Sequence, residues 1–388
     1  MADRDSARRN TDHHRLALYQ GIVAAIPKMA ANVDSAVFND FVQRYFEHLP
    51  FDKLSQETPE ELAGTAASHY RLLQTHKDSP LVQVSNPNFE VYGWQSPHTI
   101  LEIVAEDKPW LVASVRTALI RGGHRLHRVL HPVIHEKSGP AKSLIHVEID
   151  ALPIAEHEAV KNDIHQTFVV LDKTRQVSEQ MLTALQTSAR SIDRREQCEF
   201  INWLTDRQFA CLGQLLLPVN DKGELTVKQR LGLFDLDDEA SCWQPEDVSA
   251  ERLMEHDFSN KPLLIYKGSR RSPVIRNEHV DVIMLPILDS EGVLDSVLCT
   301  AGLFVFGLQN EAVSNIPWLR ERFQRVIDAS GASDTSHDGK AIASTLRSLP
   351  RDILMQNSSK TLLDMSLGIV SLQEQPVSYT HLTLPTKA

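Results

Sequence analysis

The sequence predicts an α+β protein with a helical N-terminus, a βαββα domain, a helical connector, and a second mixed α/β module that contains an antiparallel hairpin. Three observations support this prediction. Apolar residues recur at helical spacing over residues 16–79. Between residues 80 and 150, short apolar runs alternate with turn residues, which is typical of strands. Residues 289–292 read Asp-Ser-Glu-Gly between two apolar runs, which indicates a hairpin.

The composition sets the class of protein. The chain has 388 residues, of which 42% are hydrophobic, and a formal net charge of −11. This length predicts two or three domains, and the acidic balance argues against nucleic-acid binding. Four cysteines without a CxxC pair, and a polar start without a signal sequence, predict a cytoplasmic location. The longest apolar runs are about half of the ~20 residues that a transmembrane helix needs, so no membrane association is expected.

The first 15 residues are polar and are expected to form a disordered tail. The N-terminal helices then occupy residues 16–79. In one of them, Thr58 can cap the N-terminus, Pro59 fits the first turn, and Glu61 completes a capping box. In the helix before it, five side chains share one face and should turn toward the core: Phe38, Phe41, Val42, Tyr45 and Phe46.

Residues 80–172 are predicted to form the βαββα domain, which is most of a ferredoxin-like unit. After the first strand, Pro109 suits the first turn of a helix that has Trp110 on its apolar face and stops at Gly122-Gly123. A fourth strand is not obvious, and either residues 81–84 or another subunit could supply it. The other predicted elements are strands over residues 99–107, 124–136 and 143–152 and a helix over residues 156–171.

In the second half, residues 173–207 are predicted to form a continuous helical connector, followed by the mixed module over residues 208–330. Pro286 falls inside a predicted strand and argues for an edge or a bulge there, because proline donates no hydrogen bond. Helices are expected over residues 331–366, and a strand at residues 368–373 is expected to begin an incomplete domain over residues 367–376. The remaining predictions are strands over residues 209–218, 262–267, 280–288 and 293–306, a helix stopped by Gly331, and a helix over residues 341–355.

No dinucleotide-binding loop is apparent. The pattern GxGxxG is absent, and Gly122-Gly123 lacks the strand-to-helix turn that brings backbone N–H groups to a pyrophosphate. The patterns GxSxG and HExxH are also absent. We therefore expect this chain to contain no catalytic residue and to bind no cofactor.

A group of histidines raises the question of a metal site. His127, His131 and His135 are four residues apart, and imidazole is a good zinc ligand. However, Pro132 and the surrounding apolar residues indicate a strand, on which the outer two of these histidines are too far apart for one metal ion. His146 on the next strand could approach one of them. A partly exposed sheet face is the favoured interpretation, and a metal site is the alternative.

The turn formed by Asp107, Lys108 and Pro109 joins the first strand of the βαββα domain to its helix. A helix N-terminus beside a strand end has free N–H groups that can receive a carboxylate. Asp107, Lys108 and Trp110 are therefore the candidate residues for binding an amino-acid effector. A purely structural turn is the alternative that we favour.

Several short motifs occur in a characteristic order. They are Ser85-Asn-Pro-Asn, Gly93-Trp94, His98-Thr99, His131-Pro132-Val133, SLIHVEID at residues 143–150, Glu199-Phe200, Leu212-Gly213, Ile316-Pro317, Gly339-Lys340 and Leu349-Pro350-Arg351-Asp352. Over roughly residues 15–375, this set resembles the N-terminal region of the large NAD-specific glutamate dehydrogenases of bacteria.

The resemblance implies a fold and a context. Members of that family are very long chains in which ACT-type regulatory domains and helical modules precede the dehydrogenase domain. Residues 80–172 would then be the first ACT-like domain, and the parent enzyme would oxidise L-glutamate to 2-oxoglutarate and ammonia with NAD. The partners implied are the rest of the parent chain, like subunits in a homo-oligomer, and an amino-acid effector. Residues 377–388 depart from the family pattern and are interpreted as a non-native read-through tail.

Three functional hypotheses follow. The leading hypothesis is a non-catalytic regulatory and assembly region of a glutamate dehydrogenase. The second is a free-standing ACT-type amino-acid sensor, which would need a complete C-terminal domain. The third is a metal-dependent enzyme that uses the histidine group.

Overall fold

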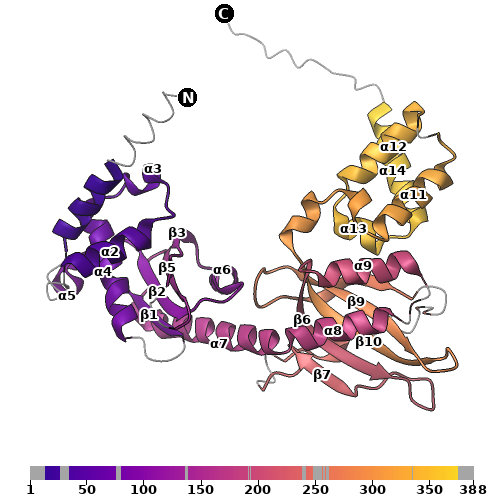
Figure 1. Ribbon diagram of the computed structural model, residues 1–388, viewed down its shortest axis with the longest axis horizontal. Helices are drawn as coiled ribbons and strands as arrows, with labels where there is room; N and C mark the ends of the chain where they lie inside the picture. The colour runs from indigo at the N-terminus through magenta and orange to yellow at the C-terminus, as the bar shows by residue number, and fades with distance from the viewer. Residues whose placement is uncertain are drawn as a thin grey trace, which may run out of the picture. The chain divides into compact units, whose positions relative to one another are not determined.

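The computed structural model describes residues 14–26, 35–75, 80–135, 139–190, 192, 194–237, 242–247, 256, 258, 262–333 and 335–374 (Figure 1). Of the disordered tail predicted over residues 1–15, residues 1–13 lie outside the described residues, and residues 14 and 15 are helical, so that part of the prediction is wrong. The predicted tail at residues 377–388 also lies outside the described residues. The chain divides into two compact units. The first comprises Met1–Asp172 with Pro273–Asn277, and the second comprises Lys173–Ser272 with Glu278–Ala388. Both contain helices and an antiparallel sheet, so the predicted α+β class is confirmed.

The helices at the start of the first unit form one core with its sheet. The predicted aromatic face is confirmed, since Phe38, Phe41 and Phe46 are buried and pack with Val104 and Leu144 of the sheet. Figure 1 shows α2 and α4 beside this sheet. The helices are residues 14–24, α2 (Ser35–Phe46), α3 (Phe51–Leu54) and α4 (Pro59–Thr75).

The capping box at the start of α4 is also confirmed. The backbone N–H of Glu61 donates to Oγ1 of Thr58 at 3.2 Å, and the backbone N–H of Thr58 donates to Oε2 of Glu61 at 3.0 Å. Two N–H groups that have no partner inside the helix are thereby satisfied. This box fixes where α4 begins.

The sheet of the first unit contains the fourth strand that the sequence left open. Strand β1 (Leu81–Ser85) pairs antiparallel with β2 (Thr99–Glu106), so the chain itself supplies this strand. The strand order is β1-β2-β5-β3, the order of a ferredoxin-like sheet in which the edge strand precedes the βαββα unit. The remaining elements are α5 (Phe89–Tyr92), α6 (Leu111–Arg121), β3 (Leu126–Leu130), β4 (Val133–Ile134), β5 (Lys142–Ile149), η2 (Ile154–Glu156) and α7 (His157–Gln176).

Two local predictions for this unit are wrong. The single strand expected over residues 124–136 is divided into β3 and β4, because Pro132 between them has no N–H to donate to the ladder. Both parts still pair with β5. The helix expected from Pro109 begins only at Leu111, because Trp110 before it has left-handed backbone angles, with φ at 69°. Trp110 is also 37% exposed, so it does not lie on the buried face of that helix as predicted. The predicted stop at Gly122-Gly123 is confirmed, with Gly123 at φ 81°.

The second unit contains a five-stranded antiparallel sheet in the order β7-β6-β10-β9-β8. The predicted hairpin is confirmed, and the Asp289 carboxylate shapes its turn by accepting from the N–H groups of Glu291 and Val293, both at 2.9 Å. Pro286 lies in β9 beyond the point where β8 pairs with it, so there β9 has β10 as its only strand partner in the described chain. The strands are β6 (Phe209–Pro218), β7 (Gln229–Gly232), β8 (Leu264–Arg271), β9 (His279–Leu288) and β10 (Leu294–Phe304), with η3 (Pro245–Asp247) between β7 and β8. Strand β7 was not predicted.

The predicted continuous connector over residues 173–207 is wrong. Helix α7 ends at Gln176, and two shorter helices follow, α8 (Ser178–Ala189) and α9 (Arg195–Thr205). Met181 of α8 and Phe200 of α9 are buried in the same core as Ile283 and Leu298 of the sheet. These helices therefore form part of the second unit itself.

The C-terminal helices differ from the prediction in two places. The helix expected over residues 341–355 is interrupted at Pro350, and the strand expected at residues 368–373 is helical, because Leu362, Ser366 and Val370 are four residues apart and all buried on one face. The elements are η4 (Phe306–Asn310), η5 (Val313–Asn315), α11 (Leu319–Ser330), α12 (His337–Ser348), α13 (Arg351–Gln356) and α14 (Ser359–Glu374). Gly331 follows the last residue of α11, so the predicted stop of this helix is confirmed. No described helix is both long and apolar enough to cross a membrane.

Candidate functional site

The predicted effector turn is held by bonds within the protein. The Asp107 carboxylate accepts from Oγ of Ser143 at 2.5 Å, and the Lys108 ammonium lies 3.2 Å from Asp172. Trp110 is partly exposed, and no side chain caps the N-terminus of α6 behind it. The structure thus places an exposed indole beside an uncapped helix start, with Asp107 and Lys108 already engaged.

The structure does not bring the predicted histidine ligands together. Nε2 of His127 lies 2.5 Å from the Asp150 carboxylate, and Nε2 of His131 lies 2.9 Å from Oγ of Ser143. His135 contributes its backbone carbonyl, which accepts from Arg44 at 3.3 Å. The break at Pro132 and the spacing along the strands separate the three imidazoles.

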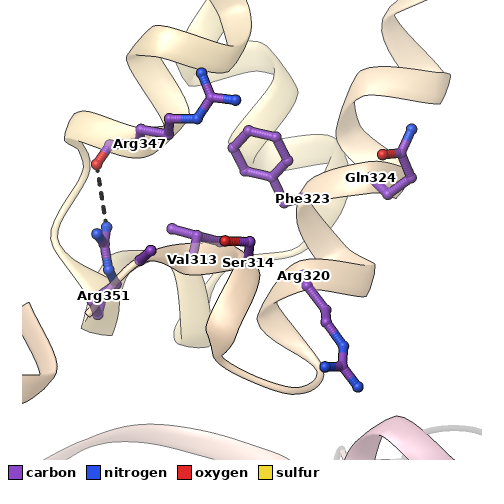
Figure 2. A pocket seen from close by; sticks show the side chains of 8 residues that line it. Val313, Ser314, Arg320, Phe323, Gln324, Arg347 and Arg351 are labelled. Atoms are coloured by element: carbon purple, nitrogen blue, oxygen red, sulfur yellow. Dashed lines mark hydrogen bonds between the residues drawn. The ribbon is translucent and has the colours of Figure 1, made fainter.

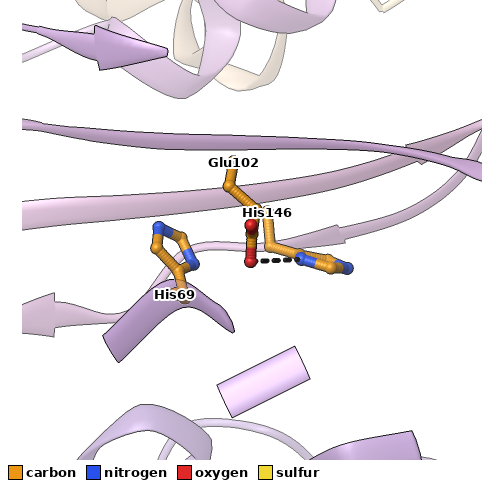
Figure 3. A group of neighbouring side chains, drawn as sticks. All are labelled: His69, Glu102 and His146. Atoms are coloured by element: carbon orange, nitrogen blue, oxygen red, sulfur yellow. Dashed lines mark ion pairs between the residues drawn. The ribbon is translucent and has the colours of Figure 1, made fainter. Parts of the chain in front are cut away.

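A different group of titratable side chains is buried between α4 and the sheet. It consists of His69 on α4, Glu102 on β2 and His146 on β5 (Figure 3). All three residues are 0% exposed. Glu102 and His146 face each other across the β2–β5 ladder. One potential ligand atom from each residue lies within 4.8 Å of the others. We call these three residues the buried triad.

The hydrogen bonds of His69 define its protonation. One ring nitrogen, Nε2, lies 3.0 Å from the carbonyl of Ile103, and the other, Nδ1, lies 2.9 Å from the hydroxyl of Tyr45. Because a carbonyl can only accept, Nε2 carries the proton and Nδ1 accepts from Tyr45. Burial lowers the pKa of His69 to about 3, so the ring is neutral at physiological pH.

The other two members of the buried triad are only partly satisfied. Oε2 of Glu102 accepts from Oγ of Ser68 at 2.7 Å. Oε1 of Glu102 and Nδ1 of His146 have no hydrogen-bond partner among the described residues, although they lie only 4.0 Å apart. Burial raises the pKa of Glu102, and the nearby His146 opposes that rise. An unpaired buried polar atom is costly, so this gap requires an explanation.

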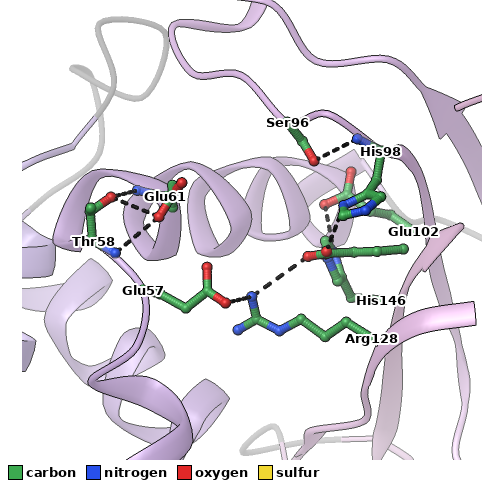
Figure 4. Close-up of polar contacts among 9 residues, drawn as sticks. Glu57, Thr58, Glu61, Ser96, His98, Glu102, Arg128 and His146 are labelled. Atoms are coloured by element: carbon green, nitrogen blue, oxygen red, sulfur yellow. Dashed lines mark hydrogen bonds and ion pairs between the residues drawn. The ribbon is translucent and has the colours of Figure 1, made fainter. Parts of the chain in front are cut away.

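Charged side chains surround the far side of His146 (Figure 4). Nε2 of His146 lies 3.3 Å from Glu148, which also contacts Arg128 at 3.6 Å and His98 at 3.4 Å. Arg128 in turn reaches Glu57 at 3.2 Å. Burial alone would raise the pKa of Glu148, but the hydrogen bond from His146 and the neighbouring positive charges outweigh it and lower the pKa. Glu148 is therefore a carboxylate that orients His146.

One feature of the sequence indicates this site. Glu102 is the one charged residue inside the apolar run from Ile100 to Ala105, and a charge at such a position is rarely buried without a partner. Of the three residues, only His146 is named among the sequence predictions, as a residue that could approach another histidine. His69 was missed because its face of α4 becomes identifiable only when the helix is packed on the sheet.

A second candidate site lies among the helices of the second unit (Figure 2). A cavity of about 380 Å³ is lined by three arginines, Arg320, Arg347 and Arg351, together with Phe323 and Gln324. The Arg320 guanidinium is paired with Glu196 at 2.7 Å, and that of Arg351 donates to the carbonyl of Glu311. The Arg347 guanidinium lies 5.5 Å from the centre of the Phe323 ring. The sequence did not predict this cavity.

Comparison with known proteins relates both units to one enzyme. Residues 41–188 match the family model of the glutamate dehydrogenase ACT1 domain, and residues 316–375 match that of glutamate dehydrogenase helical motif 1. The chain is also similar to two curated proteins, each described as an NAD-specific glutamate dehydrogenase. The protein from Pseudomonas aeruginosa is 29% identical over 86% of this chain, and that from Halomonas elongata is 29% identical over 89% of it.

The chain spans 23% of the length of each of the two relatives. The first model covers α4, the whole sheet of the first unit and the buried triad, and the second covers the helices α11 to α14. Residues 41–188 are therefore similar to the ACT1 domain of glutamate dehydrogenase, and residues 316–375 to its helical motif 1, so the two matched segments correspond to two parts of the same kind of enzyme.

Proposed function

We propose that this chain is the regulatory and assembly region of an NAD-specific glutamate dehydrogenase. The parent enzyme would oxidise L-glutamate, with water and NAD, to 2-oxoglutarate, ammonia and NADH in the cytoplasm. Its dehydrogenase site would lie in the part of the relatives that this chain does not span. On this proposal the chain alone is inactive and binds no NAD.

The observation that carries the proposal is the antiparallel character of both sheets. Dinucleotide sites form at the carboxyl ends of parallel strands, where a βαβ crossover presents a helix N-terminus to the pyrophosphate. Every strand pair in the described chain is antiparallel. The match to an ACT1 domain supports a regulatory role for the same residues.

The two edge strands of the first sheet support assembly with like subunits. Its outer strands β1 and β3 are each five residues long, and each has a strand partner on one side only in the described chain. The outer main-chain groups of such strands are suited to pairing with another chain. We propose that these edges contact other parts of the parent enzyme or a second subunit.

For the effector, we propose an amino acid whose carboxylate lies at the start of α6, near Asp107, Lys108 and Trp110. The uncapped N–H groups of the first turn and the positive end of the helix favour a carboxylate. The Lys108 ammonium lies at the same turn, where the carboxylate of the ligand would compete for it with Asp172, which is 3.2 Å away. The partly exposed indole of Trp110 supplies an apolar surface for the rest of the molecule.

Calorimetric titration of the purified chain with each of the common L-amino acids tests the effector site. We expect one or a few of them to bind, and Lys108→Ala to weaken that binding at least about tenfold, which corresponds to loss of one charge-assisted contact. Lys161→Ala, which removes a lysine from α7, is the matched control and should leave the affinity unchanged. If no amino acid bound, or if both variants behaved alike, an effector site at this turn would be ruled out.

A further inference from the structure

We propose that the buried triad of His69, Glu102 and His146 binds a zinc ion that joins α4 to strands β2 and β5. The proposal does not depend on the parent enzyme's activity. It rests on where the potential ligand atoms lie and on what already holds the other end of each side chain.

The ligand atoms have the right chemistry and nearly the right spacing. Two imidazole nitrogens and one carboxylate oxygen are common zinc ligands, with bonds of about 2.0–2.2 Å. Tetrahedral bonds of that length place two ligand atoms about 3.4 Å apart. Oε1 of Glu102 and Nδ1 of His146 are 4.0 Å apart, so a small inward movement would bring them to bonding distance. These two atoms are also the ones without a hydrogen-bond partner.

Each ligand side chain is oriented by a second bond, as is usual in zinc sites. Nε2 of His69 donates to the carbonyl of Ile103, and Nε2 of His146 faces the Glu148 carboxylate. Oε2 of Glu102 accepts from Ser68. These partners leave Nδ1 of His146 and Oε1 of Glu102 for the metal, whereas Nδ1 of His69 would have to give up its bond from Tyr45. Glu148 adds a second negative charge nearby.

One existing bond must be exchanged. Nδ1 of His69 accepts from the hydroxyl of Tyr45 at 2.9 Å, so zinc would replace that hydrogen bond. In return, the two buried atoms that lack a hydrogen-bond partner, Oε1 of Glu102 and Nδ1 of His146, would gain one. Tyr45 is therefore not required as a ligand, and its removal should not weaken the metal site.

The test measures zinc bound by the whole purified chain against a competing chelator, with zinc as the only added metal. Surface histidines bind zinc too weakly to retain it under those conditions. We expect one zinc ion per chain, held by the three side chains with a water molecule as the fourth ligand. When Co²⁺ replaces zinc, we expect the intense visible absorption that is typical of tetrahedral coordination. His146→Gln should abolish both signals, whereas His131→Gln, a histidine next to the same sheet, and Tyr45→Phe should retain them.

A substitution at Glu148, which is not a ligand, tests whether loss of zinc binding in His146→Gln reflects loss of a ligand rather than loss of folding. Glu148→Gln keeps the size of the side chain and should weaken zinc binding by about 10–100-fold without abolishing it, because it only orients His146. Zinc should also raise the unfolding temperature of the wild-type chain and not that of His146→Gln. Absence of tightly bound zinc in the wild-type chain, or equal loss in His131→Gln, would overturn the proposal.

Discussion

Gly232→Ala is expected to destabilise the second unit by about 3 kcal/mol or more. Gly232 ends β7 and has a φ of +63°, and an alanine in that region costs about 1–2 kcal/mol by itself. A Cβ atom at this position would also collide with the backbone carbonyl of Leu212 on the neighbouring strand. Backbone atoms in the middle of a sheet cannot move aside without breaking the ladder between Gly213 and Gly232. Strain and collision therefore add together.

A matched variant separates these two contributions. Gly292 also has a positive φ, +81°, but apart from its own residue and its two chain neighbours no heavy atom lies within 4 Å of where its Cβ would be. Gly292→Ala should therefore lose only about 1–2 kcal/mol from backbone strain. Urea unfolding of each variant, followed by circular dichroism, gives the comparison for the transition of the second unit. Equal losses in the two variants would contradict the close approach of β7 to β6.

Leu362→Ala is the second substitution with a large expected effect. Leu362 lies on the buried face of α14 at 1% exposure, and removing a buried leucine side chain costs about 2–5 kcal/mol. Leu367 is in the same helix at 47% exposure, so Leu367→Ala should change the free energy of unfolding by no more than about 0.5 kcal/mol. Urea unfolding measures both. Similar losses for the two leucines would contradict the helical register of residues 359–374.

Local chemistry made some elements predictable. The capping box of Thr58 and Glu61, the glycines after α6, and the Asp289 turn each depend on contacts within a few residues of sequence, and all three are confirmed. The apolar run at residues 368–373 is short enough to suit a strand or a buried helix equally well. Its helical state is set by packing against α11 and α12, which lie earlier in the chain.

The buried triad could not be predicted from spacing along the sequence. The buried triad joins residues 69, 102 and 146, which come together only after β2 and β5 have paired and α4 has packed on them. Spacing along the sequence therefore directed attention to His127, His131 and His135, which the structure separates. Asp107, Lys108 and Trp110 lie within four residues of one another, so spacing along the sequence could nominate this turn, and its role in effector binding stays a prediction. The bond from Ser143 to Asp107 and the bond from Lys108 to Asp172 were not predicted.

Equilibrium binding of NAD to the purified chain tests the assignment as a non-catalytic region most directly. Calorimetry should detect no binding of NAD, with or without L-glutamate, and no NADH should form from glutamate. The full-length relative from Pseudomonas aeruginosa, assayed in parallel, serves as the positive control for both measurements. Stoichiometric binding of NAD by this chain alone would contradict the assignment, because a dinucleotide site would then exist within these 388 residues.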